Sequence, residues 1–145
     1  MKNLLEENAS IINAENTVLG RLASIVAKRL LNGERIIITN ADKILISGNH
    51  RANVQKYQQR RKIRTKSNPL RGPFYPRQSD QIVRRTIRGM LPHQKGRGKD
   101  AYNRLLVFKD VPAALSENTF EEIPEVKNFN PKSPYLTLRE LSSKI

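Results

Sequence analysis

Cysteine is absent from the 145-residue sequence, which excludes disulfide bonds, thiolate metal sites and a cysteine nucleophile. Long apolar runs are absent too, because no stretch approaches the roughly 18 apolar residues of a membrane-spanning helix. Near the N-terminus, Glu6 and Glu7 interrupt the chain before an apolar run forms, unlike in a signal peptide. We therefore expect a cytoplasmic protein without a membrane partner.

Acidic residues are scarce in the middle of the chain. Residues 51–109, called the basic segment below, hold 17 Lys and Arg but only two acidic residues, Asp80 and Asp100. Residues 1–50 hold 6 basic and 5 acidic residues, and 110–145 hold 4 and 6, so the net charges are +1, +15 and −2 in chain order. This distribution favours a nucleic-acid partner over a small neutral substrate. Solvated surface charge is the alternative, although a small domain usually carries a net charge of about 2 to 8.

Arginine is more frequent than lysine in the basic segment, by 11 residues to 6. The guanidinium group is a planar fork that suits phosphate oxygens and stacks on bases, whereas the lysine ammonium group is a point charge. Proline at positions 69, 73 and 76 favours extended and turn conformations between these arginines. The residues predicted to bind RNA are Arg60, Arg61, Arg64, Arg71, Phe74, Tyr75, Arg77, Arg84, Arg85, Arg88, His93, Arg97 and Lys99.

Two aromatic residues, Phe74 and Tyr75, stand between Arg71 and Arg77. They can stack on unpaired bases, or they can pack the loop onto the domain, and both interpretations stay open. For His93, in a basic loop, we expect an RNA contact or a solvated ring rather than a catalyst. The glycines at positions 72, 89, 96 and 98 have two possible explanations. Glycine allows the backbone to approach RNA closely, or it serves an ordinary turn or helix end and, at position 89, core packing.

The hydrophobic pattern predicts alternating strands and helices. Apolar runs favour strands over residues 10–14, 35–39, 44–48 and 105–108. The β-branched run Ile36-Ile37-Ile38 is typical of a parallel strand that is covered on both faces, and the helix that precedes it makes one βαβ unit. Helices are predicted over residues 18–31, 50–64, 79–91 and 99–104.

A chain of this length supports one core, so we expect one domain. Residues 1–112 are predicted to form a single α/β RNA-binding domain that includes the basic segment. Residues 113–145 are predicted to be an acidic, proline-containing tail packed on or beside it, mostly extended and ending in a short helix over 136–144. Its acidic residues can dock on a basic neighbouring protein or simply keep the chain soluble.

The motifs of an enzyme are missing. The first strand is followed by no G-x-G-x-x-G, and Gly96-x-Gly98-Lys99 lacks the spacing and the Ser or Thr of a phosphate-binding loop. His50 and His93 are isolated, whereas metal sites need clustered ligands. We therefore expect no catalytic residue, no metal and no cofactor. A nucleic-acid-processing enzyme or a free RNA-binding regulator remains the alternative, and metal-dependent cleavage of RNA would distinguish the enzyme.

Several motifs together resemble the universal large-subunit ribosomal protein L13 family, over residues 10–112. The Arg-Gly-Pro-Phe and Arg-Gly-Met-Leu-Pro elements are the most specific of them, and they look like those of the archaeal and eukaryotic branch. The motifs are Leu19-Gly20-Arg21-Leu22-Ala23-Ser24, Ile46-Ser47-Gly48, Asn68-Pro69-Leu70-Arg71-Gly72-Pro73, Arg88-Gly89-Met90-Leu91-Pro92-His93, Arg97-Gly98 and Arg104-Leu105.

The resemblance implies a fold and a role. The fold is a three-layer α/β/α domain with a four-stranded parallel sheet, to which the basic helix and loop are extensions. The role is that of a non-catalytic constituent of the large ribosomal subunit in the cytoplasm, which binds the subunit's rRNA, packs beside other ribosomal proteins and supports assembly and stability. We expect no small-molecule substrate and no homo-oligomer. Asn13 departs from the acidic residue usual in the family, and the absence of the long C-terminal extension of eukaryotic members favours an archaeal source.

Overall fold

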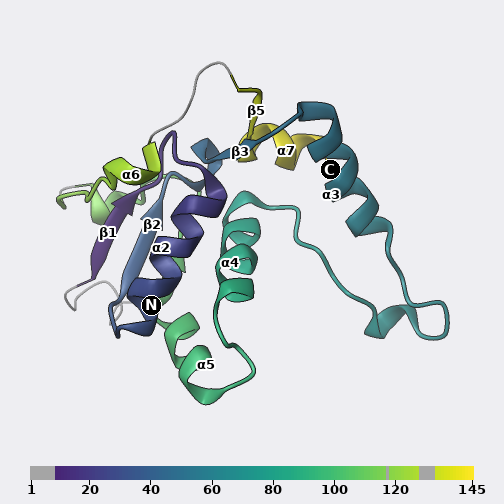
Figure 1. Cartoon of the computed structure of the whole chain (residues 1–145), viewed down its shortest axis with the longest axis horizontal. Helices are drawn as coiled ribbons and strands as arrows, with labels where there is room; N and C mark the ends of the chain where they lie inside the picture. Colours follow the sequence, from purple (N-terminus) through teal and green to yellow (C-terminus); the bar gives the residue numbers. More distant parts are fainter. Residues whose placement is uncertain (1–8, 117, 128–132) are drawn as a thin grey trace.

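An unbroken run of isoleucines forms the central strand of a parallel sheet. The computed structural model describes residues 9–116, 118–127 and 133–145 (Figure 1). Strand β2 (Ile36–Thr39) lies between β1 (Ser10–Asn13) and β4 (Leu105–Val107) and runs parallel to both. Every residue of β2 is buried, as the sequence predicts for a strand covered on both faces.

Helix α2 (Leu19–Leu31) connects β1 to β2 and completes the predicted βαβ unit. Its apolar side chains recur at helical spacing, and Leu22, Val26 and Leu30 are fully buried. Just beyond the helix, Gly33 has a φ of +102°, in the left-handed region that glycine adopts without a steric penalty. The helix predicted over residues 18–31 is therefore confirmed.

The two faces of the sheet are covered differently. On one face, Ile38 packs in the main core together with α2 and α4 (Ser79–Met90). On the other face, Ile37 packs with Leu115, the last residue of the short 3-10 turn η3 (Ala113–Leu115). The family resemblance implies helical layers on both sides, but among the described residues a 3-10 turn takes the place of a helix on the second face.

The third predicted strand does not join the parallel sheet. Strand β3 (Leu45–Ser47) pairs antiparallel with β5 (Tyr135–Thr137) in a separate two-stranded sheet. Only the 3-10 turn η1 (Ala41–Lys43) separates β2 from β3. A parallel crossover needs about a dozen residues or more, so this connection is too short to return the chain to the same sheet. Among the described residues the parallel sheet therefore has three strands, β1, β2 and β4, rather than the four that were predicted.

The C-terminal segment contributes to the core. After α6 (Pro124–Lys127), strand β5 leads directly into α7 (Leu138–Lys144), where the hydroxyl of Thr137 accepts a hydrogen bond from the backbone N–H of Glu140 at 3.2 Å. Four apolar side chains of this segment are fully buried in the main core. They are Val126, Leu136, Leu138 and Leu141.

Arg29 joins three separate parts of the chain. Its guanidinium donates to Glu34 at 2.6 Å, to Glu121 at 2.8 and 3.0 Å, and to the hydroxyl of Ser10 at 3.1 Å. The hydrogen bond to Glu121 is the main cause that raises the pKa of Arg29 above its usual value. The backbone of Glu121 also pairs with β1, because its N–H donates to Ile11 at 2.7 Å. Glu121 is therefore engaged within the protein.

Asn13 makes a polar contact at the position where the family that the sequence resembles usually has an acidic residue. Its side-chain oxygen accepts from the backbone N–H of Glu15 at 3.1 Å and from the side-chain amide of Asn40 at 2.9 Å. Asn40 has a φ of +58°, so the amide pair braces the left-handed turn that follows β2.

Two further helices, α3 and α5, lie within the basic segment. Helix α3 (His50–Lys62) projects from the core and has no buried residue, whereas α5 (Gly96–Asn103) lies below α2 and α4 in Figure 1. Both helices form where they are predicted, although α5 begins three residues earlier than expected, at position 96 rather than 99. Within the described residues, no helix is both long enough and apolar enough to cross a membrane.

Truncating Leu141 should destabilise the whole domain. Because this side chain is fully buried in the main core, Leu141→Ala should lower the free energy of unfolding by about 2–5 kcal/mol. The exposed Arg139 on the same helix provides a matched control, and Arg139→Ala should change it by no more than about 0.5 kcal/mol. Urea unfolding followed by circular dichroism measures both. Equal, small effects would contradict a C-terminal segment that contributes to the core.

Candidate nucleic-acid interface

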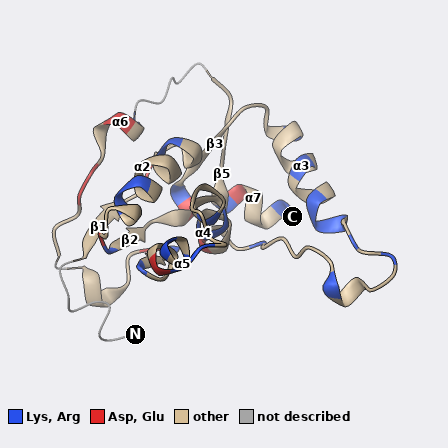
Figure 2. Cartoon of the chain, turned by 60° about the horizontal axis from the view of Figure 1, so that its bottom comes forward, with Lys and Arg blue, Asp and Glu red and all other residues tan. Residues whose placement is uncertain are grey.

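The cationic side chains gather on α3, on the loop that follows it, and on α4 and α5. Figure 2 shows blue positions along α3 and its loop with no red among them. Within the described residues, none of the 17 basic residues of the basic segment forms an ion pair with a carboxylate. Ion pairs are made outside the basic segment, for example by Arg29, Lys43 and Lys127. The positive charge of these elements is therefore not neutralised by carboxylates within the described part of the chain.

Helix α3 presents its arginines near its C-terminal end. The side chain of Asn49 caps the helix by accepting from the backbone N–H of Arg51 at 2.9 Å. At the other end, the guanidinium of Arg60 lies 5.4 Å from the ring centre of Tyr57, while Arg61 is exposed. Cations at this end are favourable because the helix dipole is negative there.

The loop after α3 turns back on itself. Arg64 and Arg71 are exposed, and the side chain of Asn68 accepts from the backbone N–H of Leu70 at 3.2 Å to start the 3-10 turn η2 (Pro69–Arg71). The end of the loop is anchored by Arg77, whose Nε donates to the carbonyl of Ser142 in α7 at 3.1 Å.

Helix α4 buries one face and presents three arginines on the other, as predicted. Ile82, Val83 and Ile87 are buried against the core. Arg84 stacks over Tyr102, with its Cζ 5.0 Å from the ring centre and its Nε donating to the hydroxyl at 3.3 Å. Arg85 stacks over Tyr75 at 4.2 Å. The third arginine, Arg88, is exposed.

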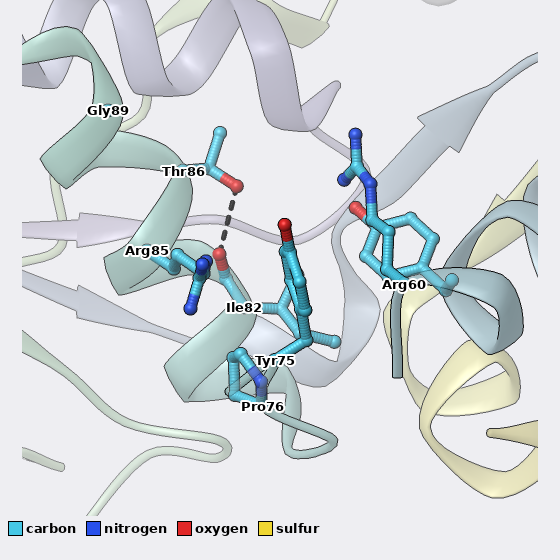
Figure 3. A pocket seen from close by; sticks show the side chains of 8 residues that line it. Arg60, Tyr75, Pro76, Ile82, Arg85, Thr86 and Gly89 are labelled. Atoms are coloured by element: carbon cyan, nitrogen blue, oxygen red, sulfur yellow. Dashed lines mark hydrogen bonds between the residues drawn. The ribbon is translucent and has the colours of Figure 1, made fainter. Parts of the chain in front are cut away.

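The two loop aromatics lie in different surroundings. Phe74 is 59% exposed, whereas Tyr75 packs between Arg85 and Arg60, whose Cζ is 6.0 Å from the Tyr75 ring centre. Beside Tyr75 is a cavity of about 270 Å³ between α3 and α4, named the tyrosine groove here and drawn in Figure 3. Its lining residues are Tyr57, Arg60, Tyr75, Pro76, Ile82, Arg85, Thr86 and Gly89.

The remaining predicted residues, His93, Arg97 and Lys99, lie in the turn between α4 and α5 and in α5 itself. His93 contacts Tyr102 edge-to-face, with ring centres 5.4 Å apart. Arg97 donates to the carbonyl of Leu31 at the end of α2 at 3.3 Å, and Lys99 is exposed. Tyr102 therefore orients both His93 and Arg84, a role that sequence reasoning missed because the partners are far apart in the chain.

Tyr57 is not among the residues that the sequence predicts to bind RNA, yet it lines the tyrosine groove. Burial raises the pKa of its hydroxyl above the usual value, partly opposed by the charge of Arg60, so the ring is neutral at physiological pH. The two histidines lie apart: Nε2 of His50 is 3.0 Å from Nζ of Lys144 in α7, whereas His93 belongs to the turn after α4.

Comparisons with known proteins agree on one family. The family described as Ribosomal protein L13 matches residues 7–114. The chain is 41% identical to the large ribosomal subunit protein uL13 of Archaeoglobus fulgidus over 140 residues, which cover 95% of this chain and 88% of that protein. It is 44% identical to the protein of the same name from Methanocaldococcus jannaschii over 134 residues, covering 92% and 94%. For the Caenorhabditis elegans protein of that name the identity is 38% over 143 residues, covering 97% of this chain and 71% of that protein.

Gly98 should be intolerant of a side chain. A Cβ at this position would lie 2.1 Å from the carbonyl oxygen of Pro92, because the two backbones touch where the turn meets α5. Gly98→Ala should therefore cost about 1–3 kcal/mol of unfolding free energy, since backbone must move to relieve the overlap. Gly96→Ala is the control, because a Cβ there meets nothing within 4 Å. Thermal unfolding of both variants tests this, and equal melting temperatures would refute the close contact.

Proposed function

Because the chain belongs to the ribosomal protein L13 family, we propose that it is a structural component of the large ribosomal subunit, in the cytoplasm, that binds the subunit's rRNA through the basic segment. The RNA-binding surface consists of α3, the loop after it, α4, and the turn into α5. The chain acts as one copy in each subunit, without forming a homo-oligomer, and it contributes to the subunit's assembly and stability rather than to a chemical reaction.

The observation that carries the RNA-binding proposal is the uncompensated charge of the basic segment. Several of its arginines are held by uncharged partners, such as the ring of Tyr102 beneath Arg84 and the carbonyl of Leu31 beside Arg97. These contacts restrict the side chains without neutralising them, so less conformational entropy is lost when a phosphate binds. Each guanidinium can then donate two parallel hydrogen bonds to phosphate oxygens.

Phosphate binding would release counterions that are condensed on the RNA. Counterion release makes the affinity depend steeply on salt, and about 6–10 phosphate contacts correspond to a loss of roughly 10³- to 10⁵-fold in affinity between 50 and 200 mM salt. The base edges and the RNA shape would then select the site, because phosphate contacts carry no sequence information. Neighbouring ribosomal proteins are further partners, and the exposed Glu125 on α6 is available to a basic one.

An RNA-processing enzyme or a free regulator would use the same charged surface. The enzyme alternative is tested by looking for cleavage of RNA. Purified protein incubated with rRNA and Mg²⁺ or Mn²⁺ should leave the RNA intact, because the proposed role involves no bond cleavage. Cleavage that is abolished by a chelator would favour the enzyme.

Sedimentation of a native lysate tests the ribosomal role. In sucrose gradients at low salt, the chain should migrate with the large subunit, and mass spectrometry should count one copy per subunit. It should stay with the subunit at moderately high salt if its contacts are many and partly buried by rRNA. A chain found mainly free, or in a smaller complex, would contradict the proposal.

Removing one unpaired arginine should weaken the salt dependence of binding. In titrations of purified large-subunit rRNA, Arg64→Ala should reduce the slope of log affinity against log salt by about 1, because one phosphate contact is lost. The control is Lys43→Ala, since Nζ of Lys43 is already paired with the carboxylate of Glu15 at 2.9 Å. Equal slopes for wild type and Arg64→Ala would show that Arg64 does not meet a phosphate.

A further inference from the structure

Gly89 has no role in the fold that requires glycine. It lies near the end of α4, is exposed, and has a φ within the ordinary helical range. A Cβ built on it would meet nothing within 4 Å, so the core-packing interpretation of this glycine is wrong. At Gly98, in contrast, the close approach of Pro92 accounts for the glycine. Alanine would stabilise α4 relative to glycine, so stability alone does not explain Gly89.

Gly89 forms part of the wall of the tyrosine groove. In Figure 3 the Tyr75 ring stands between the guanidinium groups of Arg85 and Arg60, and Gly89 lies on the helix beside them. The missing side chain leaves this side of the groove open. With a volume of about 270 Å³, the groove lies just below the roughly 300–1,000 Å³ of typical small-molecule pockets, which suits a single planar ring.

The lining of the groove has the chemistry that RNA-binding proteins use for unstacked bases. The guanidinium planes of Arg60 and Arg85, which lie over the Tyr75 ring, and the second ring, that of Tyr57, offer flat surfaces for stacking. Ile82 and Pro76 add apolar contact. No carboxylate lines the groove, so nothing there repels a nucleotide phosphate. An adjoining hollow shares Tyr75 and Arg85 with the groove and adds Arg88, which is placed to hold a neighbouring phosphate.

We propose that the tyrosine groove receives one unpaired base of the rRNA, which stacks on a tyrosine ring or a guanidinium plane and passes beside Gly89. This inference rests on the proposed RNA-binding function and adds a specific contact to it. The charged side chains on either side bind the phosphates, and the groove itself recognises an extruded nucleotide. Double-stranded RNA offers no base that could enter, so the groove would favour a bulge, loop or strand end.

A side chain at position 89 should block the groove without harming the fold. Gly89→Leu should unfold at a temperature no lower than that of the wild type, because the position is exposed and nothing lies within 4 Å of a Cβ. Its affinity for purified large-subunit rRNA should fall by roughly 5- to 100-fold, the range expected for losing one stacked base. The slope of log affinity against log salt should not change, since no cation has been removed.

Gly20→Leu is the matched control, because Gly20 is also exposed on a helix, has no atom within 4 Å of a Cβ, and lies outside the basic segment. It should bind rRNA as the wild type does. If the wild type itself fails to bind rRNA, the proposed function is wrong. If the wild type binds and Gly89→Leu binds equally well, only the groove assignment is overturned. A smaller salt slope in Gly89→Leu would also overturn it, because a phosphate rather than a base would then occupy the groove.

Ultraviolet cross-linking of the wild-type complex gives an independent measurement. A base stacked in the groove should cross-link to Tyr57 or Tyr75, and mass spectrometry of the digested complex should find a nucleotide on the peptide that holds one of them. The cross-link should be lost in Gly89→Leu and kept in Gly20→Leu. Cross-links confined to peptides outside the groove would contradict the proposal.

Discussion

The structure depends on keeping many cationic side chains apart from a small apolar core. The basic segment carries a net charge of +15, and no carboxylate pairs with it within the described residues. Burying such charges without partners would be costly, so the sheet and α2 supply the core while α3 and its loop project away from it (Figure 1). Helix α4 belongs to both parts, because Ile82, Val83 and Ile87 are buried while its arginines face outward. The buried Ala101 of α5 and Leu105 of β4 also join the basic segment to the core.

Uncharged contacts give the basic surface its geometry. Several of the arginines lie on tyrosine rings or donate to backbone carbonyls, as Arg104 does to Leu30 at 2.8 Å. Pairing with carboxylates would orient the guanidinium groups equally well, but it would neutralise them and remove the reason for an RNA to bind. Tyr102 and Tyr75 therefore order the side chains while leaving their charge available, which is the property that the proposed rRNA contact needs.

The sequence predicted the elements well and their pairing less well. The isoleucine run, the apolar spacing of α2 and the amphipathic pattern of α4 are local signals, and all three were read correctly. The placement of β3 depends instead on the shortness of η1 and on a partner strand some ninety residues away, at 135–137, which has only three residues and follows a proline. In the candidate interface, the arginines were predicted from composition, whereas the orienting role of Tyr102 requires the fold.

Strand β5 and helix α7 fix the position of α3 and of the loop that leads from α3 to α4. Strand β5 pairs with β3, which leads directly into α3. Helix α7 then contacts α3 and the end of this loop. Gln58 of α3 donates to the carbonyl of Lys144 at 2.9 Å, and Arg77, just before α4, donates to the carbonyl of Ser142 at 3.1 Å. Since α7 is itself held by the buried Leu138 and Leu141, the apolar core determines where α3 and α4 face each other. The tyrosine groove lies between these two helices, so its shape depends on the packing of β5 and α7, which lie outside the basic segment.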